Sequence, residues 1–137
     1  MFRVRQCALA LAAVAGCTTS SPEIASVPLD AGFRLQVARR PMHPVFAEYV
    51  REARLYQGDS VVALDSLLAD TGGYGKLSVY DRGGGEYLMR GPLESYRVST
   101  STRTIARLDS IPRLGQLLGT FDSSREGDWT FIRAPGK

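Results

Sequence analysis

The sequence predicts an α+β domain in which two or three helices pack on a small mixed or antiparallel sheet, after an N-terminal leader and a flexible tether. Three observations lead to this class. Some segments alternate apolar and polar residues, as strands do, while others space apolar residues three and four apart, as amphipathic helices do. The chain also opens with a basic and then an apolar stretch. The expected order of elements is β-α-α-β-β-β-α-β.

The N-terminal residues have the pattern of a secretion signal. Arg3 and Arg5 precede any acidic residue, and residues 7–15 form an uncharged apolar run. A basic start, a short apolar core and small residues after it are typical of such signals. The run is too short to cross a bilayer, which requires about 20 apolar residues in a helix. A buried first helix is the alternative.

The end of this run carries a more specific pattern. Val14, Ala15 and Gly16 precede Cys17, and this quartet resembles the lipobox of bacterial lipoproteins. The resemblance implies cleavage between Gly16 and Cys17, which makes residues 1–16 the signal peptide and Cys17 the lipid-bearing first residue. In that family an aspartate after the cysteine favours the inner membrane. Thr18 stands there instead, which predicts an anchor in the outer membrane that faces the periplasm.

Composition excludes several classes of function. Two of the 17 basic residues leave with the signal and all 14 acidic residues stay, so the mature chain has a net charge of about +1. Its basic and acidic residues are interspersed, whereas a nucleic-acid-binding protein is expected to cluster its basic residues. Cys7 leaves with the signal and Cys17 takes the lipid. No cysteine then remains for a disulfide, a metal site or thiol catalysis, and the fold must rely on its hydrophobic core.

Residues 17–32 are expected to be a flexible tether, because they are rich in Ser, Thr, Pro and Ala without helical or strand periodicity. An edge strand through residues 24–29 is the alternative. A single globular domain is expected over residues 33–137. Residues 33–37 alternate apolar and polar side chains, which predicts its first strand.

Three helices are expected. Residues 44–56 begin with a proline suited to a first helical turn and place their apolar side chains on one face. Residues 60–68 follow a capping Asp or Ser, and a glycine pair then ends that helix. Residues 111–121 carry an apolar stripe at helical spacing. Gly115 and Gly119 each destabilise such a helix by about 1 kcal/mol relative to alanine, although small residues can instead allow close packing on the sheet.

The remaining segments are predicted as strands. Residues 76–90 place two short strands around a glycine-rich turn, the pattern of a hairpin. Residues 95–107, rich in Thr, Ser, Val, Tyr and Arg, are expected to form one long strand or a strand pair. Residues 129–133 form the last strand.

The sequence offers little sign of catalysis. His43 is the only histidine and lies between two prolines, which favours a loop residue over a catalytic base. The segment 72–76 is rich in glycine and ends in Lys76, but Leu77 follows where a phosphate-binding loop requires Ser or Thr. We therefore expect a non-enzyme without cofactor or metal.

Tyrosines are the main candidates for a binding surface. Tyr80, Tyr87 and Tyr96 lie on the predicted hairpin and the strand after it. Alternation places Leu77 and Val79 on one face and Tyr80 on the other. Tyrosine is enriched at protein interfaces, so these three residues form a candidate partner surface. Alternatively, most of these tyrosines fill half-buried positions of the sheet.

Two functional hypotheses follow. The first is a structural or assembly component of an envelope complex, such as a secretion, conjugation or pilus system. Residues 58–68, and residues 110–118 with 129–133, resemble helix–strand units of secretin N-terminal-type domains, and some secretion-system lipoproteins carry such a domain. The second is a stand-alone periplasmic binding or enzyme-inhibitor lipoprotein. Small lysozyme-inhibitor lipoproteins are the analogy, although they usually rely on a disulfide and a β-barrel.

Overall fold

The computed structural model describes residues 20–71 and 75–136, and its regular structure there is almost entirely strand. Besides one short 3-10 turn, η1 (Asp30–Gly32), these ranges hold ten strands. The strands are β1 Glu23–Pro28, β2 Phe33–Pro41, β3 Tyr49–Gln57, β4 Ser60–Asp70, β5 Leu77–Gly83, β6 Glu86–Arg90, β7 Ser95–Ser99, β8 Thr104–Leu108, β9 Gln116–Ser123 and β10 Trp129–Arg133.

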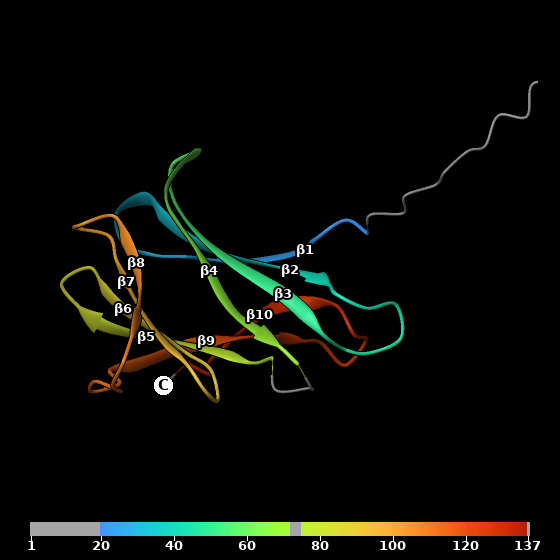
Figure 1. Cartoon of the computed structure of the whole chain (residues 1–137). Coiled ribbons are helices and arrows are strands. Elements are labelled where there is room, and N and C mark those ends of the chain that lie inside the picture. Colours follow the sequence, from blue (N-terminus) through green and yellow to red (C-terminus); the bar gives the residue numbers. More distant parts are fainter. Residues whose placement is uncertain (1–19, 72–74, 137) are drawn as a thin grey trace, which may run out of the picture.

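The strands form two antiparallel sheets that lie face to face (Figure 1). The first sheet is a four-stranded meander in the order β1-β2-β3-β4. The second has six strands in the order β10-β9-β5-β6-β7-β8, so the connection from β8 to β9, residues 109–115, passes three strands. Strand β1 lies against β10, and β4 lies against β8. The two sheets therefore approach each other along both edges and enclose one core.

The core consists of side chains that point from each sheet toward the other. Strands alternate their side chains between two faces, so every second residue can be buried. In β3, for example, Arg51, Ala53 and Leu55 are buried, whereas their neighbours are not. The apolar core residues are Ala25, Val27, Phe33, Leu35, Val37, Ala53, Leu55 and Leu67 of the first sheet, and Leu77, Val79, Tyr87, Met89, Tyr96, Val98, Phe121 and Trp129 of the second.

The predicted α+β class is wrong, because the first two expected helices are strands. Residues 49–57 and 60–70 form the β3–β4 hairpin, closed at Gly58, which has a positive φ of 58°. Tight hairpin turns favour glycine at such a position. The period of two was hidden in the sequence because a core position of β3 holds Arg51. With a charged residue at that position, the spacing of the apolar residues in 44–56 matches one face of a helix better than one face of a strand.

The third expected helix is also wrong. Residues 111–115 have no regular structure, and residues 116–123 form β9. Gly115 has a φ of 88°, which L-residues with a side chain rarely adopt, and its backbone lies against the carbonyl of Asp81. Gly119 likewise lies against the carbonyl oxygen of Ile132 in β10. The two glycines do allow close packing, but of strand β9 and its preceding segment against β5 and β10, and not of a helix on the sheet.

The expected tether is partly folded. Its residues 23–28 form β1, which pairs with β2 from Glu23 opposite Arg39 to Pro28 opposite Arg34. This is the edge strand that the sequence left as the alternative. Val27 belongs to the core, so the segment is held by apolar packing as well as by hydrogen bonds. Residues 1–19 lie outside the described residues.

The other expected strands are confirmed. The strand at residues 33–37 lies in β2, and the hairpin at residues 76–90 is β5–β6. Residues 95–107 form a pair of strands, β7 and β8, and residues 129–133 are β10.

Candidate functional site

Polar side chains connect the two sheets at several points. The hydroxyl of Tyr96 in β7 accepts a hydrogen bond of 2.7 Å from the backbone N–H of Leu68 in β4. The hydroxyl of Tyr87 in β6 donates to Oδ2 of Asp30 at 3.0 Å and accepts from the N–H of the same residue at 3.2 Å. Both tyrosines thus join an apolar ring in the core to a polar partner on the opposite sheet or its connection.

The tyrosine surface expected from the sequence is therefore not formed. Tyr87 and Tyr96 are only 2% and 1% exposed, so they cannot contact a partner. Tyr80 is half-buried, on the face of β5 opposite Val79, as alternation predicted. Burial raises the pKa of both Tyr87 and Tyr96 above the ordinary value, and the carboxylates of Asp30 and Glu94 respectively act in the same direction. These two phenols are structural links between the sheets.

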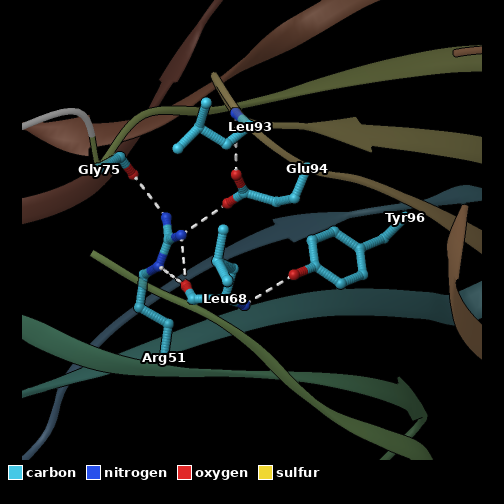
Figure 2. A network of polar contacts seen from close by, with 6 residues as sticks. All are labelled: Arg51, Leu68, Gly75, Leu93, Glu94 and Tyr96. Carbon is cyan, nitrogen blue, oxygen red and sulfur yellow. Dashed lines mark hydrogen bonds and ion pairs between the residues drawn. The ribbon is translucent and has the colours of Figure 1, made fainter. Parts of the chain in front are cut away.

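A buried ion pair forms a further link between the sheets (Figure 2). Nη2 of Arg51 in β3 lies 2.6 Å from Oε1 of Glu94, which precedes β7. The side chains are 3% and 2% exposed. The guanidinium also donates twice to the carbonyl of Leu68, from Nε at 2.9 Å and from Nη2 at 2.6 Å, and once to the carbonyl of Gly75 at 3.2 Å. One arginine thus connects β3, β4, the segment before β5 and the β6–β7 loop.

The backbone around Glu94 is shaped to receive its carboxylate. The N–H of Gly91 donates to the carbonyl of Glu94 at 2.9 Å and closes the β6–β7 turn. A Cβ at Gly91 would lie 2.6 Å from the carboxylate carbon of Glu94, closer than real Cβ contacts allow. The second carboxylate oxygen accepts from the N–H of Leu93 at 3.2 Å. Any larger residue at position 91 would therefore have to displace the carboxylate of Glu94.

The ion pair lies beside a pocket of about 500 Å³. Its walls come from the end of β4 and from the β6–β7 loop, and they consist of Leu68, Ala69, Asp70, Thr71, Pro92 and Leu93 in addition to the ion pair. Figure 2 shows that Leu68 and Leu93 lie on either side of the paired charges. This volume is in the range of small-ligand pockets, about 300–1,000 Å³. The pocket can accept an apolar group next to polar groups that are already paired.

Leu93 is a large apolar side chain of this pocket that is highly exposed. It is 81% exposed and follows Pro92, which is also exposed. Proline fixes its own φ and restricts the residue before it. The leucine is therefore presented to solvent by a turn whose backbone is held by Gly91 and by the buried carboxylate of Glu94.

A second buried arginine lies elsewhere, where β1, β2 and β10 meet. Arg39 lies 2.7 Å from Glu23 through Nε and donates from Nη1 to the hydroxyl of Ser123 at 3.0 Å. Its guanidinium carbon is 4.3 Å from the ring centre of Tyr49 and 4.6 Å from that of Trp129. Such cation–π contacts stabilise a largely buried guanidinium. This cluster connects β1, through Glu23, to β2, β3 and the second sheet.

The remaining candidates from the sequence have the following positions. His43 lies in the exposed β2–β3 loop, where its Nδ1 accepts from the N–H groups of Val45 at 3.1 Å and Phe46 at 3.4 Å. Gly16 and Cys17 lie outside the described residues, as does part of the glycine-rich segment 72–76. Within the described ranges, no three His, Cys, Asp or Glu side chains are grouped as metal ligands, and no helix is long and apolar enough to span a membrane.

Sequence reasoning missed Arg51 and Glu94. The helix expected over residues 44–56 would place Arg51 on its polar face, and no motif in the sequence marks Glu94. A charged residue gives no sign in a single sequence that it will be buried, since burial requires a partner from a distant segment. The one local signal was the Gly91-Pro92 dipeptide, which marks a turn.

The comparisons with known proteins found no relative of this chain. The chain matches no known protein family, no curated protein and no solved structure.

Proposed function

We propose that this protein is a lipoprotein of the bacterial outer membrane, anchored through Cys17, and that its β-sandwich is a periplasmic binding module. The pocket between β4 and the β6–β7 loop binds an apolar side chain of a protein partner in the cell envelope. The observation that carries the binding role is the exposed Leu93 beside this pocket.

Support for the anchor comes from the sequence. The basic start, the apolar run and the lipobox-like quartet ending at Cys17 stand in the order that lipoprotein maturation requires. Each buried CH₂ group contributes about 0.8 kcal/mol to membrane binding, and two or more acyl chains hold a protein stably. A diacylated or triacylated Cys17 is therefore sufficient to keep the domain at the membrane.

Support for protein binding comes from the geometry of the pocket. Interface hot spots are a few side chains that fill well-packed pockets from which the surrounding contacts exclude water. Leu68, Ala69 and Leu93 supply apolar walls, while Arg51 and Glu94 satisfy each other at the side. A partner can bury an apolar side chain here without leaving either charge unpaired, which would be costly.

The comparison with secretin N-terminal-type domains loses its basis. It depended on helices within residues 58–68 and 110–118, and the structure has strand or irregular backbone there. The proposal therefore does not extend to a secretion, conjugation or pilus component. The analogy with small inhibitor lipoproteins gains from the two β-sheets, although the mature chain that we propose holds a single cysteine, Cys17, and theirs usually rely on a disulfide.

The anchor is tested by metabolic labelling with a palmitate analogue. We expect label on the wild-type protein and none on Cys17→Ser. Label that persists on the Cys17→Ser variant would show that the lipid, if any, is attached elsewhere and would contradict the proposal.

The pocket is tested by photo-crosslinking in cells. A photoreactive amino acid replaces Leu93 in the full chain, and a matched variant carries it at Val61, which is also exposed but lies on β4 near the β3–β4 turn. We expect one adduct from position 93 and none from position 61, and a Leu68→Trp change that fills the pocket should remove it. Identical adducts from both positions, or an adduct that is insensitive to Leu68→Trp, would refute the binding role.

A further inference from the structure

The β2–β3 loop, residues 42–48, is mostly exposed and carries one charged residue, Glu48, directly before β3. Residues 42–47 are all exposed, and none of them is Asp, Glu, Lys or Arg. The large side chains of Met42, Val45 and Phe46 are 52%, 78% and 63% exposed. A run of adjacent exposed apolar side chains marks a site of contact with a protein or a membrane.

Internal hydrogen bonds give this loop a defined shape. The N–H of Met42 donates to the carbonyl of Glu48, and the N–H of Glu48 donates to the carbonyl of Phe46, both at 2.8 Å. His43 lies inside the turn, where its Nδ1 accepts two backbone N–H groups and its ring lies 4.7 Å from that of Phe46. The loop satisfies part of its own backbone polarity and directs its apolar side chains outward.

The position of the loop identifies what it faces. Together with Ser20 and Tyr49, it lines a hollow. The loop lies at the end of the sandwich where β1 begins (Figure 1). Only Thr18 and Thr19 separate Ser20 from Cys17 in the sequence. Three residues span at most about 10–11 Å, because this is their length when the chain is fully extended. A lipid on Cys17 therefore holds this loop within reach of the bilayer surface.

We propose that the β2–β3 loop inserts Met42, Val45 and Phe46 into the lipid surface beside the acylated Cys17. The inference rests on the proposed lipid anchor. The loop is the second point of contact, so it fixes how the domain stands on the membrane. The pocket beside Leu93 then lies on a part of the surface that does not include this loop.

The test uses the full, processed protein in vesicles of phosphatidylethanolamine and phosphatidylglycerol that contain a lipid with a nitroxide on its acyl chain. An environment-sensitive dye is attached to Val45→Cys or, as the matched control, to Val61→Cys. Val61 is also exposed but lies near the far end of β3, about 25 Å from the loop at the usual rise per residue. The thiol of Cys17 is acylated, so each variant has one reactive thiol.

We expect the dye at position 45 to be quenched by the nitroxide at least twice as strongly as the dye at position 61. Adding Phe46→Ser should reduce this quenching by about half, which shows that the loop and not the dye drives insertion. Equal quenching at positions 45 and 61 overturns the inference. Protection of position 45 from aqueous iodide without nitroxide quenching also overturns it, because a protein then covers the loop.

Flotation of the vesicles separates this inference from the anchor. Wild-type protein that floats, together with a loop that is not quenched, refutes the insertion alone and leaves the lipoprotein proposal standing. Protein that does not float with the vesicles refutes the anchor and the insertion that rests on it.

Discussion

Replacing Glu94 with glutamine removes a charge from the core while keeping the shape of the side chain. In the wild-type protein this carboxylate faces the guanidinium of Arg51 at 2.6 Å, with both side chains almost fully buried. In the Glu94→Gln variant the guanidinium keeps its carbonyl partners at Leu68 and Gly75 but loses its counter-charge. A buried charge without a counter-charge is strongly destabilising.

The expected loss can be estimated. Removing one partner of a buried ion pair costs about 3–5 kcal/mol, and we expect about 3 kcal/mol because glutamine retains a hydrogen-bond acceptor. For a domain of about 115 residues the entropy of unfolding is about 0.24 kcal/mol/K, so this loss lowers Tm by about 12 °C. Thermal unfolding followed by circular dichroism, with urea unfolding as a second measure, gives the difference.

Glu52→Gln is the matched control. Glu52 pairs with Arg54 at the same distance of 2.6 Å, but those side chains are 34% and 39% exposed. Exposed pairs contribute about 0.2–1 kcal/mol, so the control should lower Tm by at most about 4 °C. Equal shifts in Tm for Glu94→Gln and Glu52→Gln would refute the reasoning that burial makes the Arg51–Glu94 pair important. If Glu94→Gln does not fold, Arg51→Lys, which keeps the charge, should still fold with an intermediate loss.

Three further predictions concern the contacts between and within the sheets. Burial raises the pKa of Tyr87 and Tyr96, so their contribution to stability is complete below pH of about 10 and falls as the pH rises further. The midpoint of urea unfolding should therefore be lower at about pH 11 than at about pH 9. The same drop in midpoint between these pH values in the two Tyr→Phe variants would contradict this explanation. Gly91→Ala should cost about 1–3 kcal/mol by displacing the neighbouring carboxylate, whereas Gly136→Ala, which meets no atom, should change stability by less than about 0.5 kcal/mol. The indole N–H of Trp129 donates to the carbonyl of Val37 in β2 at 3.1 Å, and Trp129→Phe removes this donor. The expected loss of unfolding free energy, measured in urea, is about 1–3 kcal/mol. A loss below about 0.5 kcal/mol would show that this hydrogen bond does not contribute to stability.

Local patterns predicted the elements that depend on neighbouring residues. The β5–β6 hairpin follows from two short strand-like segments, the first of them alternating, on either side of three consecutive glycines, and Gly83, Gly84 and Gly85 all take positive φ. Residues 33–37 alternate apolar and polar side chains, and residues 129–133 were also predicted as a strand. Alternation with a period of two and a glycine-rich turn both depend on residues that are close in the sequence. They can therefore be recognised without knowing which distant strand each segment pairs with.

The tertiary structure decided the rest, because those features depend on residues far apart in the chain. Arg51 occupies a core position of β3, where Glu94, 43 residues later, supplies its counter-charge. This charge at a core position hides the apolar period of two that would have marked the strand. Tyr87 and Tyr96 are buried because Asp30 and Leu68 supply partners for their hydroxyls. The pocket beside Leu93 is formed by β4 and the β6–β7 loop. The predicted export signal and lipid attachment site at Cys17 come from the sequence alone, whereas the surfaces that the domain presents come from its long-range pairing.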